Sequence, residues 1–98
     1  MRCDQVVSLL KRHEPEFRGV GIGALFLFGS VASGRAHDAS DVDIFFDLAQ
    51  PNGFTLFDLV ALQKRMQEIL GAKVDLMTRN GIHPRRRPRI EASAVQIF

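Results

Sequence analysis

A short apolar run that ends at a glycine-serine pair constrains the fold more than any other feature of this chain. Residues 24–28 read Ala-Leu-Phe-Leu-Phe, and Gly29-Ser30 follows directly. This run has the length and composition of a strand that is buried on both faces. Glycine at its end allows a sharp turn and a close approach of the backbone to a ligand. We therefore expect a central strand that ends by exposing backbone N–H groups at the start of a turn or short helix.

Three further segments show a regular hydrophobic period. Apolar and polar side chains alternate in residues 42–47 and again in residues 73–78, which predicts two more strands. Between them, apolar side chains recur at helical spacing. Thr55 and Asp58 are spaced as an N-cap pair at the start of this stretch, and Gly71 stands at its end. The sequence thus predicts a helix between the two strands.

Both ends of the chain are predicted to be helical. Asp4 can cap a first helix, and Glu14-Pro15 should stop it, because the residue before a proline avoids helical angles. Near the other end, a proline within a helix would remove a backbone hydrogen bond. We therefore expect the final helix to begin near Pro88 and to carry Ile90 and Val95 inward.

The predicted order of elements is helix, strand, turn, strand, helix, strand, helix, with the turn in residues 31–40. This order is typical of an α/β or α+β domain in which helices flank a small mixed β-sheet. The chain has 98 residues, enough for one hydrophobic core that buries roughly 60 to 65% of the unfolded surface. No internal repeat or long linker divides the sequence. We expect residues 1–98 to form a single domain.

The basic charge of the chain is concentrated in one segment near the C-terminus. The net charge is +2, but it would be −2 without four arginines of this segment, Arg85, Arg86, Arg87 and Arg89. The rest of the chain is therefore slightly acidic, which argues against a general nucleic-acid-binding surface. The segment also lacks interleaved aromatic residues for base stacking. We expect a solvated or partner-facing loop rather than a site that binds nucleic acid directly.

Membrane and secretory signals are absent from the sequence. The longest apolar run, residues 22–28, is interrupted by glycine and is far shorter than the ~20 residues of a membrane span. The first residues lack the apolar region of a signal peptide, and the one cysteine, Cys3, cannot form an internal disulfide. We expect a cytoplasmic protein without a membrane-bound segment.

Acidic residues cluster around the second predicted strand. Asp41 and Asp43 are two residues apart, so their side chains leave the same face of a strand with Cα atoms ~6 to 7 Å apart. Together with Asp38 and Asp47 they fall within ten residues that contain no lysine or arginine. Unpaired like charges at this density imply a neutralising cation, and hard oxygen ligands favour Mg²⁺ over Zn²⁺. The alternative is that these aspartates only cap turns and solvate a loop.

The surroundings of this acidic pair favour a nucleotide site. Gly29-Ser30 at the end of the central strand can bind a phosphate through backbone N–H groups and the serine hydroxyl. The next strand opens with Asp41 and Asp43, and the predicted strand 73–78 supplies Asp75 on its polar face. A phosphate site, a carboxylate pair and a third acid are then expected along adjacent strand ends.

The spacing of these residues resembles that of a known enzyme superfamily. Residues 27–48, LFGSVASGRAHDASDVDIFFDL, contain Gly29-Ser30, ten residues, and then Asp41-Val42-Asp43. This is similar to the Gly-Ser, ten residues, Asp-x-Asp motif of the DNA polymerase beta nucleotidyltransferase superfamily. The following helix, the KVDLMT strand and the His83-Pro84-Arg85 segment resemble the minimal nucleotidyltransferase family, the antitoxin half of two-gene toxin–antitoxin pairs.

The resemblance implies roles for the five candidate residues. It implies that Asp41 and Asp43 bind metal ions, that Asp75 completes the catalytic metal site, and that Gly29 and Ser30 contact the nucleotide phosphates. Two Mg²⁺ ions ~3.5 to 4 Å apart can activate an attacking hydroxyl and offset the charge of the leaving pyrophosphate. Asp75 is then the candidate to accept the proton of that hydroxyl.

The resemblance also implies a substrate and a partner. Members of the minimal family are similar to enzymes that transfer AMP from ATP to a hydroxyl of a partner toxin, commonly a tyrosine, and so silence its ribonuclease activity. That partner has the helical fold called HEPN and is encoded nearby. The expected assembly is therefore a hetero-oligomer of this chain with a HEPN toxin.

Two functions remain open from the sequence. The first is an active transferase that modifies a partner protein, and the second is an antitoxin or adaptor that neutralises its partner by binding alone. Family members usually read Gly-Ser-x-Ala-Arg-Gly, whereas Ser33 stands here in place of the arginine, which favours the second function. The intact set of Asp41, Asp43 and Asp75 favours the first, because a binding protein needs no cluster of unpaired carboxylates.

Overall fold

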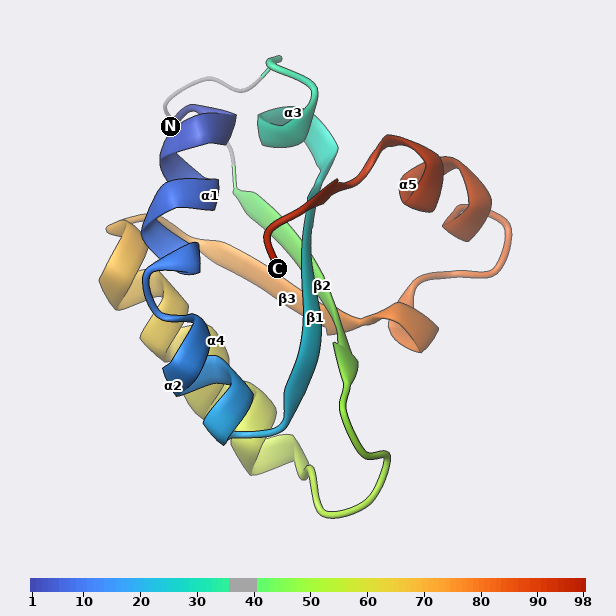
Figure 1. Cartoon of the computed structure of the whole chain (residues 1–98). Helices are drawn as coiled ribbons and strands as arrows, with labels where there is room; N and C mark the ends of the chain where they lie inside the picture. The colour runs from blue at the N-terminus through green and yellow to red at the C-terminus, as the bar shows by residue number, and fades with distance from the viewer. Residues whose placement is uncertain (36–40) are drawn as a thin grey trace.

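Four strands in the described part of the chain form one mixed sheet with helices on both sides (Figure 1). The computed structural model describes residues 1–35 and 41–98. The sheet order is β3-β2-β1-β4; β1 is antiparallel to β2 and β4, and β2 is parallel to β3. In chain order, the elements of the described residues are α1 (Cys3–Lys11), α2 (Glu14–Gly19), β1 (Ile22–Phe28), α3 (Gly29–Ala32), β2 (Val42–Leu48), α4 (Leu56–Leu70), β3 (Val74–Thr78), the 3₁₀ turn η1 (Arg79–Gly81), α5 (Arg87–Ser93) and β4 (Val95–Gln96). The predicted fold class, helices flanking a small mixed sheet, is confirmed.

The helix α4 has the capping residues that the sequence indicated. The Thr55 backbone N–H donates to Asp58 Oδ2 at 2.8 Å, and the Asp58 N–H donates to Thr55 Oγ1 at 3.3 Å, which satisfies two N–H groups at the helix start. Gly71 ends the helix with a positive φ of 64°. With 15 residues α4 is the longest helix described, and no helix in residues 1–35 or 41–98 has the length and apolar character to cross a membrane.

Side chains of α4 form hydrogen bonds with backbone groups at the outer edge of strand β3. The Gln63 side-chain amide donates to the Val74 carbonyl oxygen at 2.8 Å, and the Val74 N–H donates to Gln67 Oε1 at 3.0 Å. An unpaired strand edge would leave such backbone groups open to other chains. These bonds also hold β3 in its alignment with β2, which decides which side chains of the two strands become neighbours.

The main hydrophobic core lies between the sheet and the helices α1, α2 and α4, which cover one face of it (Figure 1). Alternate residues of β1 and β2, such as Leu25, Leu27, Ile44 and Phe46, point into this core and are fully buried. Because side chains alternate along a strand, the residues between them point to the opposite face. Asp43 is one of these residues, so the sheet directs it away from the main core.

A smaller aromatic core lies on the opposite face, under the C-terminal segment. Phe28, Phe45 and Ile82 are buried there, and Phe26 packs against them. The Phe26 and Phe45 rings stack with their centroids 4.7 Å apart, and Ile90 of α5 packs on the same cluster. This second core holds α5 over the face of the sheet from which Asp43 projects.

Several details of the sequence prediction were wrong. Helix α1 has Arg2 as its N-cap, so Asp4 lies in the first turn and pairs with the Arg2 guanidinium at 2.8 Å. Pro15 does not lead into a loop but lies in the first turn of α2, where its missing N–H costs no helical bond. Val95 lies in strand β4, paired with Leu27, rather than in the final helix.

The predicted short helical turn begins two residues earlier than expected. It forms α3, which starts at Gly29, directly after strand β1. The rest of the predicted loop, residues 36–40, lies outside the described residues. The start of the final helix near Pro88 is confirmed, because α5 begins at Arg87.

Candidate nucleotide site

Asp43 and Asp75 project from neighbouring strands at the same level of the sheet. The parallel pairing of β2 and β3 makes them register partners. Residues paired in this way have Cα atoms about 4.8 Å apart and side chains on the same face. The pairing therefore brings two carboxylate side chains, which are far apart in the sequence, to one side of the sheet.

Gly29 lies against the side chain of Asp43. Phe28, the last residue of β1, is the register partner of Asp43, and Gly29 follows it with a positive φ of 75°. A Cβ atom at position 29 would lie 2.2 Å from Asp43 Oδ2 and 3.1 Å from its Cγ. Only glycine leaves room for the carboxylate and adopts this backbone conformation without strain. Asp43 can therefore occupy its position only because the first residue of the Gly-Ser pair is glycine.

The electrostatic surroundings of Asp43 disfavour its charged form. Burial is the largest cause and raises the pKa of Asp43, and the nearby carboxylates of Asp75 and Asp41 raise it further. The positive charge of Arg86 acts in the opposite direction but does not cancel these effects. A carboxylate in this situation is stabilised by an added cation.

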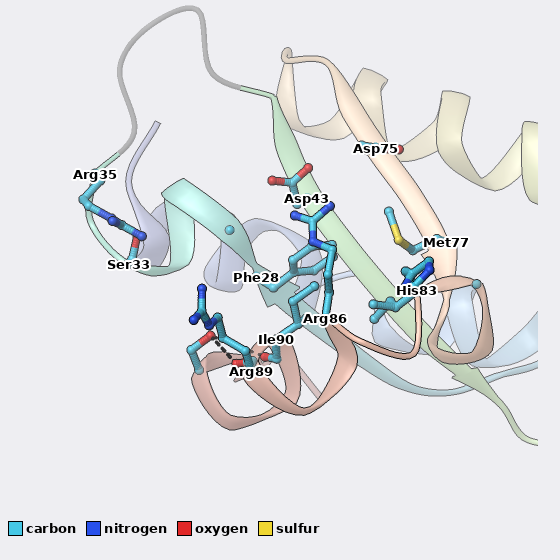
Figure 2. Close-up of a pocket in the computed structure, with 14 residues that line it drawn as sticks. Phe28, Ser33, Arg35, Asp43, Asp75, Met77, His83, Arg86, Arg89 and Ile90 are labelled. Carbon is cyan, nitrogen blue, oxygen red and sulfur yellow. Dashed lines mark hydrogen bonds between the residues drawn. The ribbon is translucent and has the colours of Figure 1, made fainter.

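A cavity of about 680 Å³ opens beside these carboxylates (Figure 2). Gly29, Asp43 and Asp75 line it from the sheet side, and the C-terminal segment closes the other side. From that segment come His83, Arg86, Arg89 and Ile90, while Ser33 and Arg35 line the cavity next to α3. A cavity of this volume is in the range that binds small molecules and cofactors.

The other predicted site residues lie at the margin of the cavity. Asp41 directly precedes β2 and is exposed, and it is not among the lining residues. Ser30 is half-buried in α3 and also does not line the cavity; its carbonyl oxygen accepts hydrogen bonds from Ser33 Oγ at 3.1 Å and from the Arg35 N–H at 2.9 Å. Asp38 lies outside the described residues.

The carboxylates do not form a closed metal cage in this structure. Within residues 1–35 and 41–98, no three acidic, histidine or cysteine side chains converge on one point where an ion could bind. In Figure 2 the carboxylate groups of Asp43 and Asp75 are not turned toward each other. The structure thus brings Gly29, Asp43 and Asp75 to one cavity and leaves Asp41 beside it.

The donor chemistry of the Asp43–Asp75 pair nevertheless fits Mg²⁺. This ion keeps several waters and binds proteins through one or two carboxylates together with substrate phosphates, rather than through a complete cage of side chains. Asp41 is close enough to raise the pKa of Asp43, so a third carboxylate stands next to the pair. The residues present can therefore hold a hydrated divalent cation.

Asp47 does not belong to the group of unpaired acids, contrary to the sequence prediction. The Arg79 guanidinium binds both of its carboxylate oxygens at 2.8 Å. Arg79 also pairs with Glu91 of α5 and lies 4.9 and 5.0 Å from the ring centroids of Phe26 and Phe45. These carboxylates raise the pKa of Arg79 above its already high value. The prediction failed because Arg79 is 32 residues from Asp47 in the sequence.

Arg86 and Arg89 are site residues that the sequence did not indicate. The arginine-rich segment as a whole was predicted to be a solvated or partner-facing loop. The structure places both residues in the wall of the cavity, and Figure 2 shows the Arg86 guanidinium extending toward Asp43. The proline at position 88 indicated only where the helix starts. Arg86 is the N-cap of that helix and Arg89 lies in its first turn, so their place in the cavity wall depends on how α5 packs on the sheet.

The chain is similar in sequence to named adenylyltransferases. A protein of Methanocaldococcus jannaschii named "Putative protein adenylyltransferase MJ0435" is 33% identical over 94 residues, which cover 96% of this chain and 91% of that protein. The protein adenylyltransferase MntA of Thermococcus cleftensis is 30% identical over 83 residues, covering 84% of this chain and 82% of that protein.

Solved structures show the same fold. A structure described as "Structure of putative minimal nucleotidyltransferase" is similar with a TM-score of 0.75 and 27% identity, covering 97% of this chain and 95% of that chain. A toxin–antitoxin structure with AMP-PNP has a TM-score of 0.71 at 20% identity, covering 100% of this chain and 73% of that chain. The family described as the nucleotidyltransferase domain matches residues 4–97. With this match, the chain belongs to the nucleotidyltransferase domain family, as its Gly-Ser and Asp-x-Asp spacing indicated.

Proposed function

We propose that this protein is a Mg²⁺-dependent adenylyltransferase that transfers AMP from ATP to a hydroxyl of a partner toxin and thereby acts as its antitoxin. The observation that carries this proposal is the placement of Asp43 and Asp75 in register in one cavity, with Gly29 against Asp43. Relatives that are named protein adenylyltransferases support the choice of AMP as the transferred group.

Each site residue has a role in this proposal. Asp43 and Asp75 hold Mg²⁺, and Asp41 joins them from the start of β2. Gly29 and Ser30 contact the nucleotide phosphates through the start of α3. When bound, the metal would lower the pKa of the attacking hydroxyl and offset the charge of the phosphates.

The reaction moves one nucleotidyl group. The hydroxyl oxygen of the partner forms a bond to the α-phosphorus of ATP, and the bond from that phosphorus to the oxygen of the β-phosphate breaks. Pyrophosphate leaves with the electron pair of the broken bond. The proton of the hydroxyl passes to a carboxylate oxygen, for which Asp75 is the candidate because it lies at the exposed side of the pair.

The proposed partner is a HEPN toxin encoded next to this chain, with a tyrosine as the acceptor. A hetero-oligomer of the two chains would place that tyrosine at the mouth of the cavity. Residues 1–98 act in it as one minimal nucleotidyltransferase domain, since nearly the whole chain matches the family.

Transfer can be tested with the purified protein, Mg²⁺, ATP labelled at the α-phosphate, and the product of the adjacent open reading frame. We expect label on that partner with the wild-type protein and none with Asp43→Asn. Asp4→Asn is a matched control, because Asp4 lies on α1 and outside the cavity. Undiminished labelling with Asp43→Asn would refute the assignment of the site.

A protein that neutralises its partner by binding alone is the second candidate function. The observation that favours it is Ser33, which lines the cavity at the position where family members usually have an arginine. In that case Asp43→Asn and the wild-type protein would inhibit the partner equally, and intact mass measurement would show no added nucleotide. The same labelling experiment therefore separates the two functions.

A further inference from the structure

We propose that Arg86 and Arg89 form the binding site for the polyphosphate of the nucleotide, opposite the carboxylates of Asp43 and Asp75. This inference rests on the proposed function, because it assigns part of the same cavity to one part of the nucleotide. It concerns two residues of the C-terminal segment that neither the Gly-Ser pair nor the Asp-x-Asp pair includes.

The four arginines of the C-terminal segment differ in their contacts. The Arg87 guanidinium donates to the carbonyl oxygens of Ile82 at 3.1 Å and of Asn80 at 3.4 Å, so it ties the segment to the preceding turn. Arg85 does not line the cavity. Arg86 and Arg89 both line it: Arg86 is the N-cap of α5, and Arg89 lies in the first turn of that helix.

Arg86 and Arg89 have no salt bridge or side-chain hydrogen bond within residues 1–35 and 41–98. The ion pairs of the described part of the chain involve other cations, and the hydrogen bonds at these two positions come from backbone atoms. Both side chains are exposed to the solvent of the cavity. Among the described residues, no existing bond of these two side chains has to break before their donors meet a ligand.

The C-terminal segment is held firmly enough to present these two arginines. Arg79 connects the Asp47 carboxylate of β2 with Glu91 of α5, and Ile90 packs on the aromatic core. These contacts lie on the sheet side of α5. They fix the helix beside the cavity, so that Arg86 and Arg89 need no large movement to meet a ligand.

The two walls of the cavity carry opposite charges, which fits the binding of a cation at one wall and of the phosphates of a nucleotide at the other. The wall with Asp43 and Asp75 repels phosphate unless a cation lies between, whereas the wall with Arg86 and Arg89 attracts it. Guanidinium groups bind phosphate oxygens with paired N–H donors, which makes arginine suited to this ligand. We assign the two arginines to the β- and γ-phosphates, which become the leaving pyrophosphate.

Calorimetric titration of the full chain with ATP and with AMP, both with Mg²⁺, tests this assignment. The variants are Arg86→Ala, Arg89→Ala, their double variant, and Arg85→Ala as the matched control. We expect each single variant at position 86 or 89 to raise the Kd for ATP about tenfold or more, since hydrogen bonds to charged groups contribute at this level. The Kd for AMP should change less than about threefold, and Arg85→Ala should resemble the wild type in both.

The assignment is overturned if the double variant binds ATP as tightly as the wild type, or if its affinities for ATP and AMP fall by the same factor. Thermal unfolding of each variant verifies that it is folded. The failure of this inference is distinguishable from failure of the proposed function. If the double variant transfers AMP to the partner and the ratio of its Kd values for ATP and AMP equals that of the wild type, only the arginine site is refuted. Arginine-dependent ATP binding without any transfer refutes only the proposed function.

Discussion

Gly29 and Asp43 are so close that a single added carbon at position 29 would come within 2.2 Å of Asp43 Oδ2. The two residues belong to different segments and are brought together by the pairing of β1 with β2. The glycine that begins α3 and the acid that projects from β2 therefore form one structural unit. A change in either residue is expected to disturb the other.

Gly29→Ala should reduce nucleotidyl transfer about 100-fold, because misplacing a reacting group by about 1 Å has effects of this size. The substitution also forces a residue with a Cβ atom into a left-handed conformation, at a cost of about 1 to 2 kcal/mol of folding stability. Gly71→Ala is the matched control, since Gly71 has a φ of 64° and no atom within 4 Å of an added Cβ. Equal losses of transfer in both variants would contradict the special role of Gly29.

Asp43→Asn should raise the Tm of the metal-free protein by a few degrees at neutral pH. Burial and the nearby carboxylates raise the pKa of Asp43, so its ionised form destabilises the native state. The amide removes this charge, while transfer activity is lost. The measurement is thermal unfolding in a chelating agent, with Asp4→Asn as the control for loss of an exposed acid. A lower Tm for Asp43→Asn than for the wild type would contradict the prediction.

Arg79→Ala should destabilise the fold by about 2 kcal/mol, because it leaves Asp47 and Glu91 without their shared partner. It should also weaken ATP binding, since α5 loses its connection to β2. Arg2→Ala, which breaks an ion pair whose side chains are 78% and 66% exposed, should cost less than about 0.5 kcal/mol. Urea unfolding measures the loss of unfolding free energy in both variants. A similar loss in the two would show that the Arg79 contacts add little to the stability of the fold.

The ion pair between Glu16 of α2 and Arg65 of α4 should make a small, pH-dependent contribution to stability. Hydrogen bonds from Arg65 lower the pKa of Glu16, so this contribution is present above the pKa of Glu16 in the unfolded chain. It is lost as the pH falls through the lowered pKa of the folded state.

Glu16→Gln tests this contribution. The Tm of the variant should lie slightly below that of the wild type at neutral pH, and the two should converge in acid and at high salt, where an exposed pair is screened. A difference in Tm that persists unchanged in acid would show that the effect of the substitution does not come from the charge of Glu16.

Helix α4 and the three main strands could be predicted because their signals are local. Thr55, Asp58 and Gly71 specify the ends of α4 through contacts with their own neighbours in the chain. The alternation of apolar residues specifies β2 and β3 in the same way. Where local signals compete, prediction was wrong: Pro15 is compatible both with the end of one helix and with the start of another.

The local elements, the fold class and the spacing of the Gly-Ser and Asp-x-Asp pairs could be read from the sequence, because these depend on residues a few positions apart. Which charged side chains meet depends instead on the tertiary structure. The register of β2 and β3 brings Asp75 beside Asp43, and the docking of α5 brings Arg86 into their cavity. Arg79 likewise reaches Asp47 across 32 residues. Such contacts depend on how strands align and how helices pack on them, which no short stretch of sequence specifies.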